Sequence, residues 1–114
     1  YEEAAALVQR LREADPEAAM GATGRLFHML HEAGVVHPDL NLKNVLIVGT
    51  GEALGARVLD LDGAAVGRRV DGAARRRMIQ RFWRSARKWE STTGVELDSG
   101  LRAAFEAGYG GRGG

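Results

Sequence analysis

With 114 residues, 45% of them hydrophobic and 27% charged, the chain has the size of one domain or one lobe, and its composition excludes intrinsic disorder. It has no cysteine, which excludes disulfides and thiolate metal sites and fits a cytoplasmic location, and no apolar run approaches the roughly 20 residues of a membrane span. The net charge of +1 is unevenly distributed: nine Lys or Arg and one acid between Arg68 and Lys88 give +8 there and leave −7 elsewhere, which favours an anionic partner for that surface.

The amino-terminal third predicts two helices. Apolar residues at helical spacing predict an amphipathic helix over 2–14, with an apolar face of Ala4, Leu7, Val8 and Leu11. Asp15 before Pro16 is typical of a helix start, in which the Asp caps the first turn and Pro takes the first helical position. A wide apolar stripe predicts that this second helix is largely buried and runs to Ala33, where Gly34 supplies the left-handed residue that ends it.

Two short segments rich in Val, Leu and Ile predict a buried antiparallel hairpin. They are Val45–Val48 and 57–61, and both read as strands. The Gly-rich loop GTGEALG between them fits a hairpin connection better than a phosphate-binding loop, because no helix starts after it.

The remainder predicts two more helices and a tail. Asp71 caps a helix that residues 91–94 break, with arginines facing outward and an inward face of Met78, Ile79, Phe82, Ala86 and Trp89. Asp98 begins a short last helix that carries Leu101 and Phe105. We expect 1–107 to form the folded lobe and the sequence GYGGRGG at 108–114 to be a flexible tail.

Polar residues cluster at the two ends of the predicted hairpin. Asp39 and Asn44 lie just before the first strand, in HPDLNLKN, and Asp60 and Asp62 follow the second, in VLDLDG. Because antiparallel pairing brings these ends together, we expect all four side chains to converge. Three carboxylates and an amide in one place require a hard cation, and such oxygen ligands favour Mg²⁺ over zinc or copper.

These two motifs carry a resemblance to a known family. HPDLNLKN has the H-x-D-x-x-x-x-N spacing of the protein-kinase catalytic loop, and DLD stands where that family has D-F-G. Followed by the Arg-rich RRRMIQRFWRSARKWE, the two motifs resemble the bacterial lipopolysaccharide core kinases, which include Kdo and heptose kinases. The resemblance covers roughly Met20 to Trp89. It implies an α+β fold, a mainly helical protein-kinase-like carboxy-terminal lobe with a small β-hairpin.

The family resemblance also implies roles for individual residues. Asp39 would be the general base, Asn44 and Asp60 would hold Mg²⁺ against the phosphates of ATP, and His37 would organise the loop. Two assignments are added to these: Lys43 as a basic group that reaches the transferred phosphoryl, and Asp62 as a second metal ligand.

Departures from regulated protein kinases point to a small-molecule or glycolipid acceptor. Pro38 stands where those kinases carry Arg, and the stretch from Asp62 to the helix cap Asp71 is too short for a long activation segment. No Gly-rich phosphate loop and no V-A-I-K-like strand precede the catalytic loop, and the chain starts at Tyr1 without Met or a signal-peptide pattern. We therefore expect a fragment or processed chain that lacks an amino-terminal lobe and is inactive alone.

The sequence thus predicts ATP-dependent phosphorylation of a sugar hydroxyl, Kdo or heptose, in lipopolysaccharide core. The outward arginines Arg76, Arg84 and Arg87 are expected to hold the lobe on the anionic inner-membrane surface. Three alternatives stay open: a basic nucleic-acid- or partner-binding helical module, an inactive kinase-like fragment, and another small-molecule kinase with the same motifs. His28 and His31 are read as a partly exposed helix surface, because no third ligand completes a zinc site.

Overall fold

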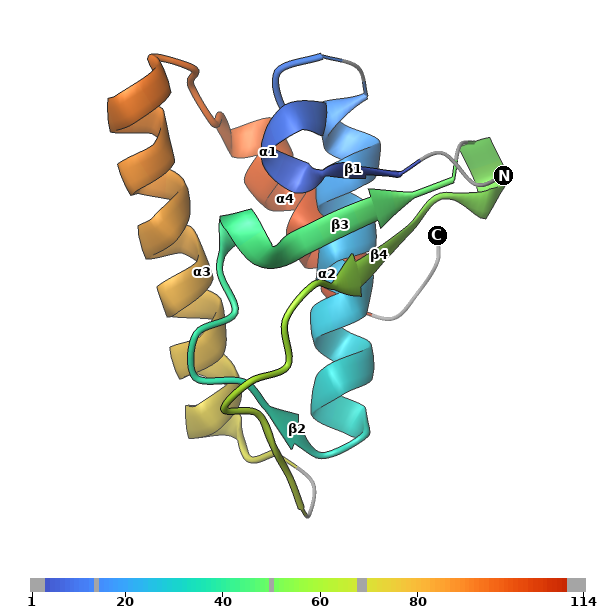
Figure 1. Cartoon of the computed structure of the whole chain (residues 1–114), viewed down its shortest axis with the longest axis vertical. Coiled ribbons are helices and arrows are strands. Elements are labelled where there is room, and N and C mark those ends of the chain that lie inside the picture. Colours follow the sequence, from blue (N-terminus) through green and yellow to red (C-terminus); the bar gives the residue numbers. More distant parts are fainter. Residues whose placement is uncertain (1–3, 14, 50, 68–69, 111–114) are drawn as a thin grey trace.

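A computed structural model of the chain describes residues 4–13, 15–49, 51–67 and 70–110. A three-stranded antiparallel sheet, ordered β1-β3-β4, crosses the long helix α2, while α3 flanks the molecule on one side and α4 packs behind α2 (Figure 1). A two-stranded sheet, β2-β5, lies at the far end of the molecule. In chain order the elements are β1 (Ala4–Ala6), α1 (Leu7–Arg10), α2 (Pro16–Glu32), β2 (Val35–Val36), the 3₁₀ turn η1 (Leu42–Asn44), β3 (Val45–Val48), the 3₁₀ turn η2 (Gly51–Ala53), β4 (Gly55–Val58), β5 (Ala65–Val66), α3 (Gly72–Thr93) and α4 (Ser99–Tyr109).

The first segment is not the helix predicted over 2–14. Ala4–Ala6 form strand β1, which pairs antiparallel with β3, so that Ala4 lies opposite Val48 and Ala6 opposite Leu46. Only Leu7–Arg10 are α-helical, and Leu7 is buried in the core. Alanine favours helix intrinsically, so the pairing offered by the open edge of β3 outweighs local propensity here.

Helix α2 begins and ends where the sequence predicts, but its start is built differently. Pro16 takes the first position, whereas the Asp15 side chain makes no capping hydrogen bond, because Asp15 adopts a left-handed backbone with φ of 50°. Gly34 has φ of 79° and ends the helix as predicted. The helix packs directly on α4: a Cβ atom at Gly24 would overlap the carbonyl of Phe105, and one at Gly108 would overlap that of Gly21.

The predicted hairpin is present with a shifted second strand. Val45 pairs with Val58 and Val48 with Gly55, so β4 ends at Val58. The expectation that 57–61 is a buried strand is wrong at its end, because Leu59 and Leu61 are 54% and 58% exposed. The Leu59 N–H donates to the carbonyl of Asn44 at 2.9 Å, after which the chain leaves the sheet.

Helix α3 presents the predicted face to the core. Asp71 Oδ1 accepts from the N–H of Ala74 at 2.8 Å, which caps the helix. Four of the five predicted inward residues are buried, and the fifth, Ile79, is half-buried. One arginine does not face outward: Arg75 is half-buried and donates to Glu32 Oε2 at 2.9 Å. The helix reaches Thr93 before Gly94, with φ of 76°, so the predicted break at 91–94 falls only at its last residue.

An aromatic cluster joins the helices. The Phe27 ring centroid lies 5.2 Å from that of Phe82 and 5.3 Å from that of Phe105, and the Phe82 and Phe105 centroids are 5.4 Å apart. Asp98 Oδ1 accepts from the N–H of Leu101 at 3.0 Å and starts α4 as predicted. Because α4 continues to Tyr109 with Gly108 buried, the folded part passes the boundary expected at 107. Residues 111–114 of the predicted tail lie outside the described residues.

Candidate active site

His37 connects the loop before β3 to the end of β4. The ring is 2% exposed, and its Nδ1 atom accepts from the main-chain N–H of Asp39 at 3.1 Å. Its Nε2 atom lies 2.6 Å from the carbonyl oxygen of Asp60. A carbonyl can only accept, so this contact assigns the proton to Nε2 and leaves Nδ1 as the acceptor. One imidazole therefore fixes the backbone next to both Asp39 and Asp60.

Asn44 closes the same loop from its other end. Its Oδ1 atom accepts from the N–H of Asn41 at 2.9 Å, and its Nδ2 atom donates to the carbonyl of Asp39 at 3.0 Å. The Asn41 side chain in turn accepts from the N–H of Lys43 at 2.9 Å, which completes a reciprocal capping box around η1. The backbone of 39–44 is therefore held on both sides, while the carboxylate of Asp39 is exposed.

The hairpin places Asn44 and Asp60 at the same end, but three carboxylates do not converge there. Within the ranges that the structure describes, no three His, Asp or Glu side chains come close enough to share a metal ion. Asp60 Oδ1 turns toward its own loop and accepts from the N–H of Asp62 at 2.9 Å. The convergence expected of Asp39, Asp60 and Asp62 is therefore not found, because this loop bond points Asp60 along the chain.

The donor set at this end nevertheless suits Mg²⁺. The second carboxylate oxygen of Asp60 makes no hydrogen bond to any described residue, and Asn44 Oδ1 has a second lone pair. Mg²⁺ is commonly held by one or two protein oxygens, with water and substrate phosphates as its remaining ligands. Asn44 and Asp60 could therefore hold such an ion without a cluster of carboxylates.

Two side chains of α3 hold the loop that carries Asp39 and Asn44. The Ser85 hydroxyl accepts from the N–H of Leu42 at 3.0 Å and donates to the carbonyl of Phe82 at 2.6 Å. The Arg81 guanidinium donates to the carbonyl of Pro38. Sequence reasoning missed both residues. The only indication in the sequence was the hydroxyl of Ser85 at the margin of the apolar face of α3. Its position does not reveal which residue it contacts.

A pocket of about 570 Å³ lies between this loop and α3. The loop contributes Asp39 and Lys43, and α3 contributes a row of residues that includes Arg81, Arg84 and Lys88. Asn44, Asp60 and Asp62 do not line it. Asp39 therefore lines a cationic pocket, and its carbonyl is also bonded to Asn44.

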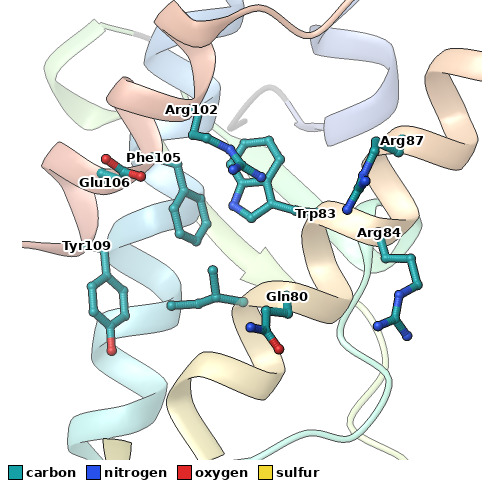
Figure 2. A pocket seen from close by; sticks show the side chains of 9 residues that line it. Gln80, Trp83, Arg84, Arg87, Arg102, Phe105, Glu106 and Tyr109 are labelled. Atoms are coloured by element: carbon teal, nitrogen blue, oxygen red, sulfur yellow. The ribbon is translucent and has the colours of Figure 1, made fainter. Parts of the chain in front are cut away.

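The predicted surface arginines occupy different places along α3. Arg76, Arg84 and Arg87 are all exposed. Arg84 and Arg87 border a second pocket of about 610 Å³, between α3 and α4, and Figure 2 shows them on the side of α3 away from Tyr109. Arg102 covers the Trp83 ring in that pocket, with its guanidinium carbon 4.6 Å from the ring centroid. Arg76 lines neither pocket.

His31 is buried, contrary to the predicted partly exposed surface. It is 0% exposed, its Nδ1 atom lies 2.8 Å from the Tyr109 hydroxyl, and its Nε2 atom lies 3.2 Å from the Met78 sulfur. Burial, and next the positive charge of Arg75, lower the pKa of His31 to about 4. This burial could not be predicted from local spacing, because Tyr109 is 78 residues away along the chain. His31 is a neutral core residue.

The arrangement defines a class of protein. A buried His organises a loop with Asp39 and Asn44, and a hairpin returns Asp60 beside it over a helical support, which is the layout of a protein-kinase-like fold. Residues 2–98 match the model of the lipopolysaccharide kinase (Kdo/WaaP) family, and the chain belongs to that family.

A solved structure supports the same fold. It is described as WaaP in complex with acyl carrier protein, and it superposes with a TM-score of 0.71 at 22% sequence identity. The match covers 92% of this chain and 45% of that chain, so the present chain spans slightly less than half of its length. The predicted kinase-like lobe with a small hairpin is confirmed. No curated protein matches this sequence. Among the described residues, no helix is long and apolar enough to cross a membrane.

Proposed function

We propose that this chain takes part in ATP-dependent phosphorylation of a sugar hydroxyl, on Kdo or heptose, in lipopolysaccharide core. The observation that carries the proposal is the double hydrogen bond of His37, which holds the backbone at Asp39 and Asp60 in one frame. Membership of the lipopolysaccharide kinase family supports the class of reaction and the class of acceptor.

Asp39 is the proposed general base. Its carboxylate is exposed, whereas its main chain is fixed through its N–H by His37 and through its carbonyl by Asn44. A carboxylate that is exposed while its main chain is held fixed can orient an acceptor hydroxyl and take its proton. Lys43, exposed on η1 and in the same pocket as Asp39, is the proposed partner of the transferred phosphoryl oxygens.

Asn44 and Asp60 are the proposed ligands of Mg²⁺ on the ATP phosphates, with Asp62 as a further ligand. When bound, the ion supplies positive charge that neutralises the phosphates. The chain contributes fixed oxygens at the end of the hairpin, held by the bond between Leu59 N–H and the Asn44 carbonyl.

The exposed arginines support a proposed location at the cytoplasmic face of the inner membrane. Arg76, Arg84 and Arg87 lie along a single helix, and no described acidic side chain pairs with them. A row of unpaired cations is attracted to anionic headgroups within a Debye length of about 8 Å at physiological salt.

The test is transfer of labelled phosphate from ATP to core oligosaccharides that carry either Kdo or heptose, with the natural protein that contains this chain. Asp39→Asn keeps the size and one acceptor of the side chain. It should reduce kcat by roughly 10²–10⁴-fold and leave the nucleotide Kd nearly unchanged. A change confined to the nucleotide Kd would make Asp39 a structural residue, and no transfer to either sugar by a protein that binds Mg²⁺·ATP would refute the proposed acceptor.

A further inference from the structure

The pocket between the catalytic loop and α3 concentrates positive charge beside Asp39. Its charged lining consists of four cations and one carboxylate: Lys43, Arg81, Arg84, Lys88 and Asp39. Among the residues described, none of Lys43, Arg84 and Lys88 forms a salt bridge with an acid. Four cations that share a concave site with a single carboxylate favour an anionic ligand.

The position of the pocket separates it from the nucleotide side of the site. Phosphoryl transfer places the attacking and leaving oxygens roughly in line, on opposite sides of the phosphorus. If Asn44 and Asp60 hold the nucleotide, the acceptor must approach Asp39 from the other side. The pocket suits such an acceptor, because its lining includes Asp39 but neither Asn44 nor Asp60.

We infer that this pocket is the acceptor site and that it binds a carboxylate or phosphate group carried by the acceptor sugar. The inference rests on the proposed function. It assigns the specificity for the acceptor to Arg84 and Lys88, which have no such role in the proposed function. The planar guanidinium of Arg84 can bind such a group with two parallel hydrogen bonds, and Lys88 adds a second charge. Arg81 already donates to the Pro38 carbonyl, so it ties the anion site to the catalytic loop.

The pocket also has room and an apolar surface for the sugar itself. About 570 Å³ falls within the range of small-molecule sites, and the lining includes Leu40, Leu42 and Trp89 beside the cations. A neutral sugar would use only part of this lining. The acceptor is therefore a sugar whose reacting hydroxyl lies near an acidic substituent.

The test is an NMR titration of the natural protein that contains this chain, labelled with ¹⁵N, with paired probes. The methyl glycoside of Kdo is compared with its carboxamide, and glucose 6-phosphate with glucose, so the two pairs distinguish a carboxylate from a phosphate. We expect the charged member of at least one pair to shift the amides of Lys43, Ser85 and Lys88, and to bind at least roughly tenfold more tightly than its neutral partner. Equal affinity within both pairs, or shifts centred on Asn44 and Asp60, would refute the acceptor site.

A matched pair of variants separates the pocket from overall charge. Arg84→Gln with Lys88→Gln should weaken the charged probe at least roughly tenfold, whereas Arg76→Gln with Arg77→Gln removes the same charge from α3 outside the pocket and should change affinity less than about twofold. Equal losses in the two doubles would refute the inference.

Binding of Mg²⁺·ADP, measured in the same samples, separates this inference from the proposed function. If Mg²⁺·ADP does not bind while the charged sugar still requires Arg84 and Lys88, the proposed function falls and the anion pocket stands. If Mg²⁺·ADP binds but the charged sugar shows no preference for the pocket, the inference alone is wrong. Displacement of the charged sugar by ADP would also overturn it, because the pocket would then be a phosphate site for the nucleotide.

Discussion

The hydroxyl of Ser85 holds the main chain at Leu42, 43 residues earlier in the sequence. It accepts the Leu42 N–H at 3.0 Å while it donates to the Phe82 carbonyl at 2.6 Å, so a single side chain links the 39–44 loop to a turn of α3. Leu42 is 1% exposed, so water does not readily replace this partner.

Replacing Ser85 with Ala should therefore loosen the loop. A buried N–H left without a partner costs about 1–3 kcal/mol, and we expect a loss of this size in urea unfolding, together with faster hydrogen exchange at the Leu42 amide. Ser91→Ala removes an exposed hydroxyl from the same helix and serves as the control. Unchanged exchange at Leu42 would mean that Ser85 does not hold the loop.

Asp60→Asn tests the proposed metal ligand with little change in shape. The amide oxygen still accepts the Asp62 N–H, but the negative charge is lost, so Mg²⁺-dependent nucleotide affinity should fall at least about tenfold. Affinity without Mg²⁺ should stay constant, and Asp60→Ala should abolish turnover. Glu52→Gln removes an acid at the opposite end of the hairpin and is the control, and an equal loss in both variants would contradict the assignment.

Gly24→Ala should destabilise the contact between α2 and α4. The added Cβ would overlap the Phe105 carbonyl, and overpacking of this kind costs typically about 1–3 kcal/mol. Gly21→Ala in the same helix is a matched control, because its Cβ would meet the Ala104 carbonyl only at 3.6 Å, an ordinary contact. Thermal unfolding should show a loss for Gly24→Ala and no loss, or a gain of up to about 1 kcal/mol, for Gly21→Ala. Similar Tm values for the two variants would refute the close backbone approach.

His31 should make the stability depend on pH in mildly acidic solution. Its pKa is lowered from 6.5 to about 4 in the folded protein, so the unfolded chain takes up the proton first as the pH falls. The neutral ring contributes its full stability above about pH 6.5, and this contribution is lost as the pH falls toward 4. The loss in the free energy of unfolding is about 2 kcal/mol after allowance for solvent screening of nearby charges. In urea unfolding at several pH values, His31→Gln should flatten this slope and His28→Gln should keep it. An equal slope in His31→Gln would exclude His31 as its source.

Neutralising Arg76, Arg84 and Arg87 together to Gln should weaken binding to vesicles that contain anionic lipid. At about 1 kcal/mol for each cation near such a surface, the loss is on the order of a hundredfold at low salt, while the KM for ATP should stay unchanged. Vesicles of neutral lipid give the baseline. A collapse of duplex DNA binding with vesicle binding intact would favour the nucleic-acid alternative instead.

The parts of the site that depend on local spacing could be predicted, and the parts that depend on packing could not. His37 and Asn44 follow from one loop motif, and Asp60 follows from hairpin pairing. Ser85 and Arg81 act on residues 43 positions away, so their roles appear only once α3 is docked. The strand Ala4–Ala6 was missed for the same reason, because its partner β3 lies some 40 residues away and alanine itself favours helix.

The distances along the chain between these partners have a consequence for folding. The β3–β4 hairpin closes through neighbours in sequence, whereas the loop bonds span 23 residues at His37 and 43 at Ser85 and Arg81. Local contacts form before distant ones, because loop closure costs more entropy as the loop lengthens. The hairpin should therefore form early, and Asp39 should reach its final place only when α3 docks. The loop that carries Asp39 is therefore completed late in the folding of this chain.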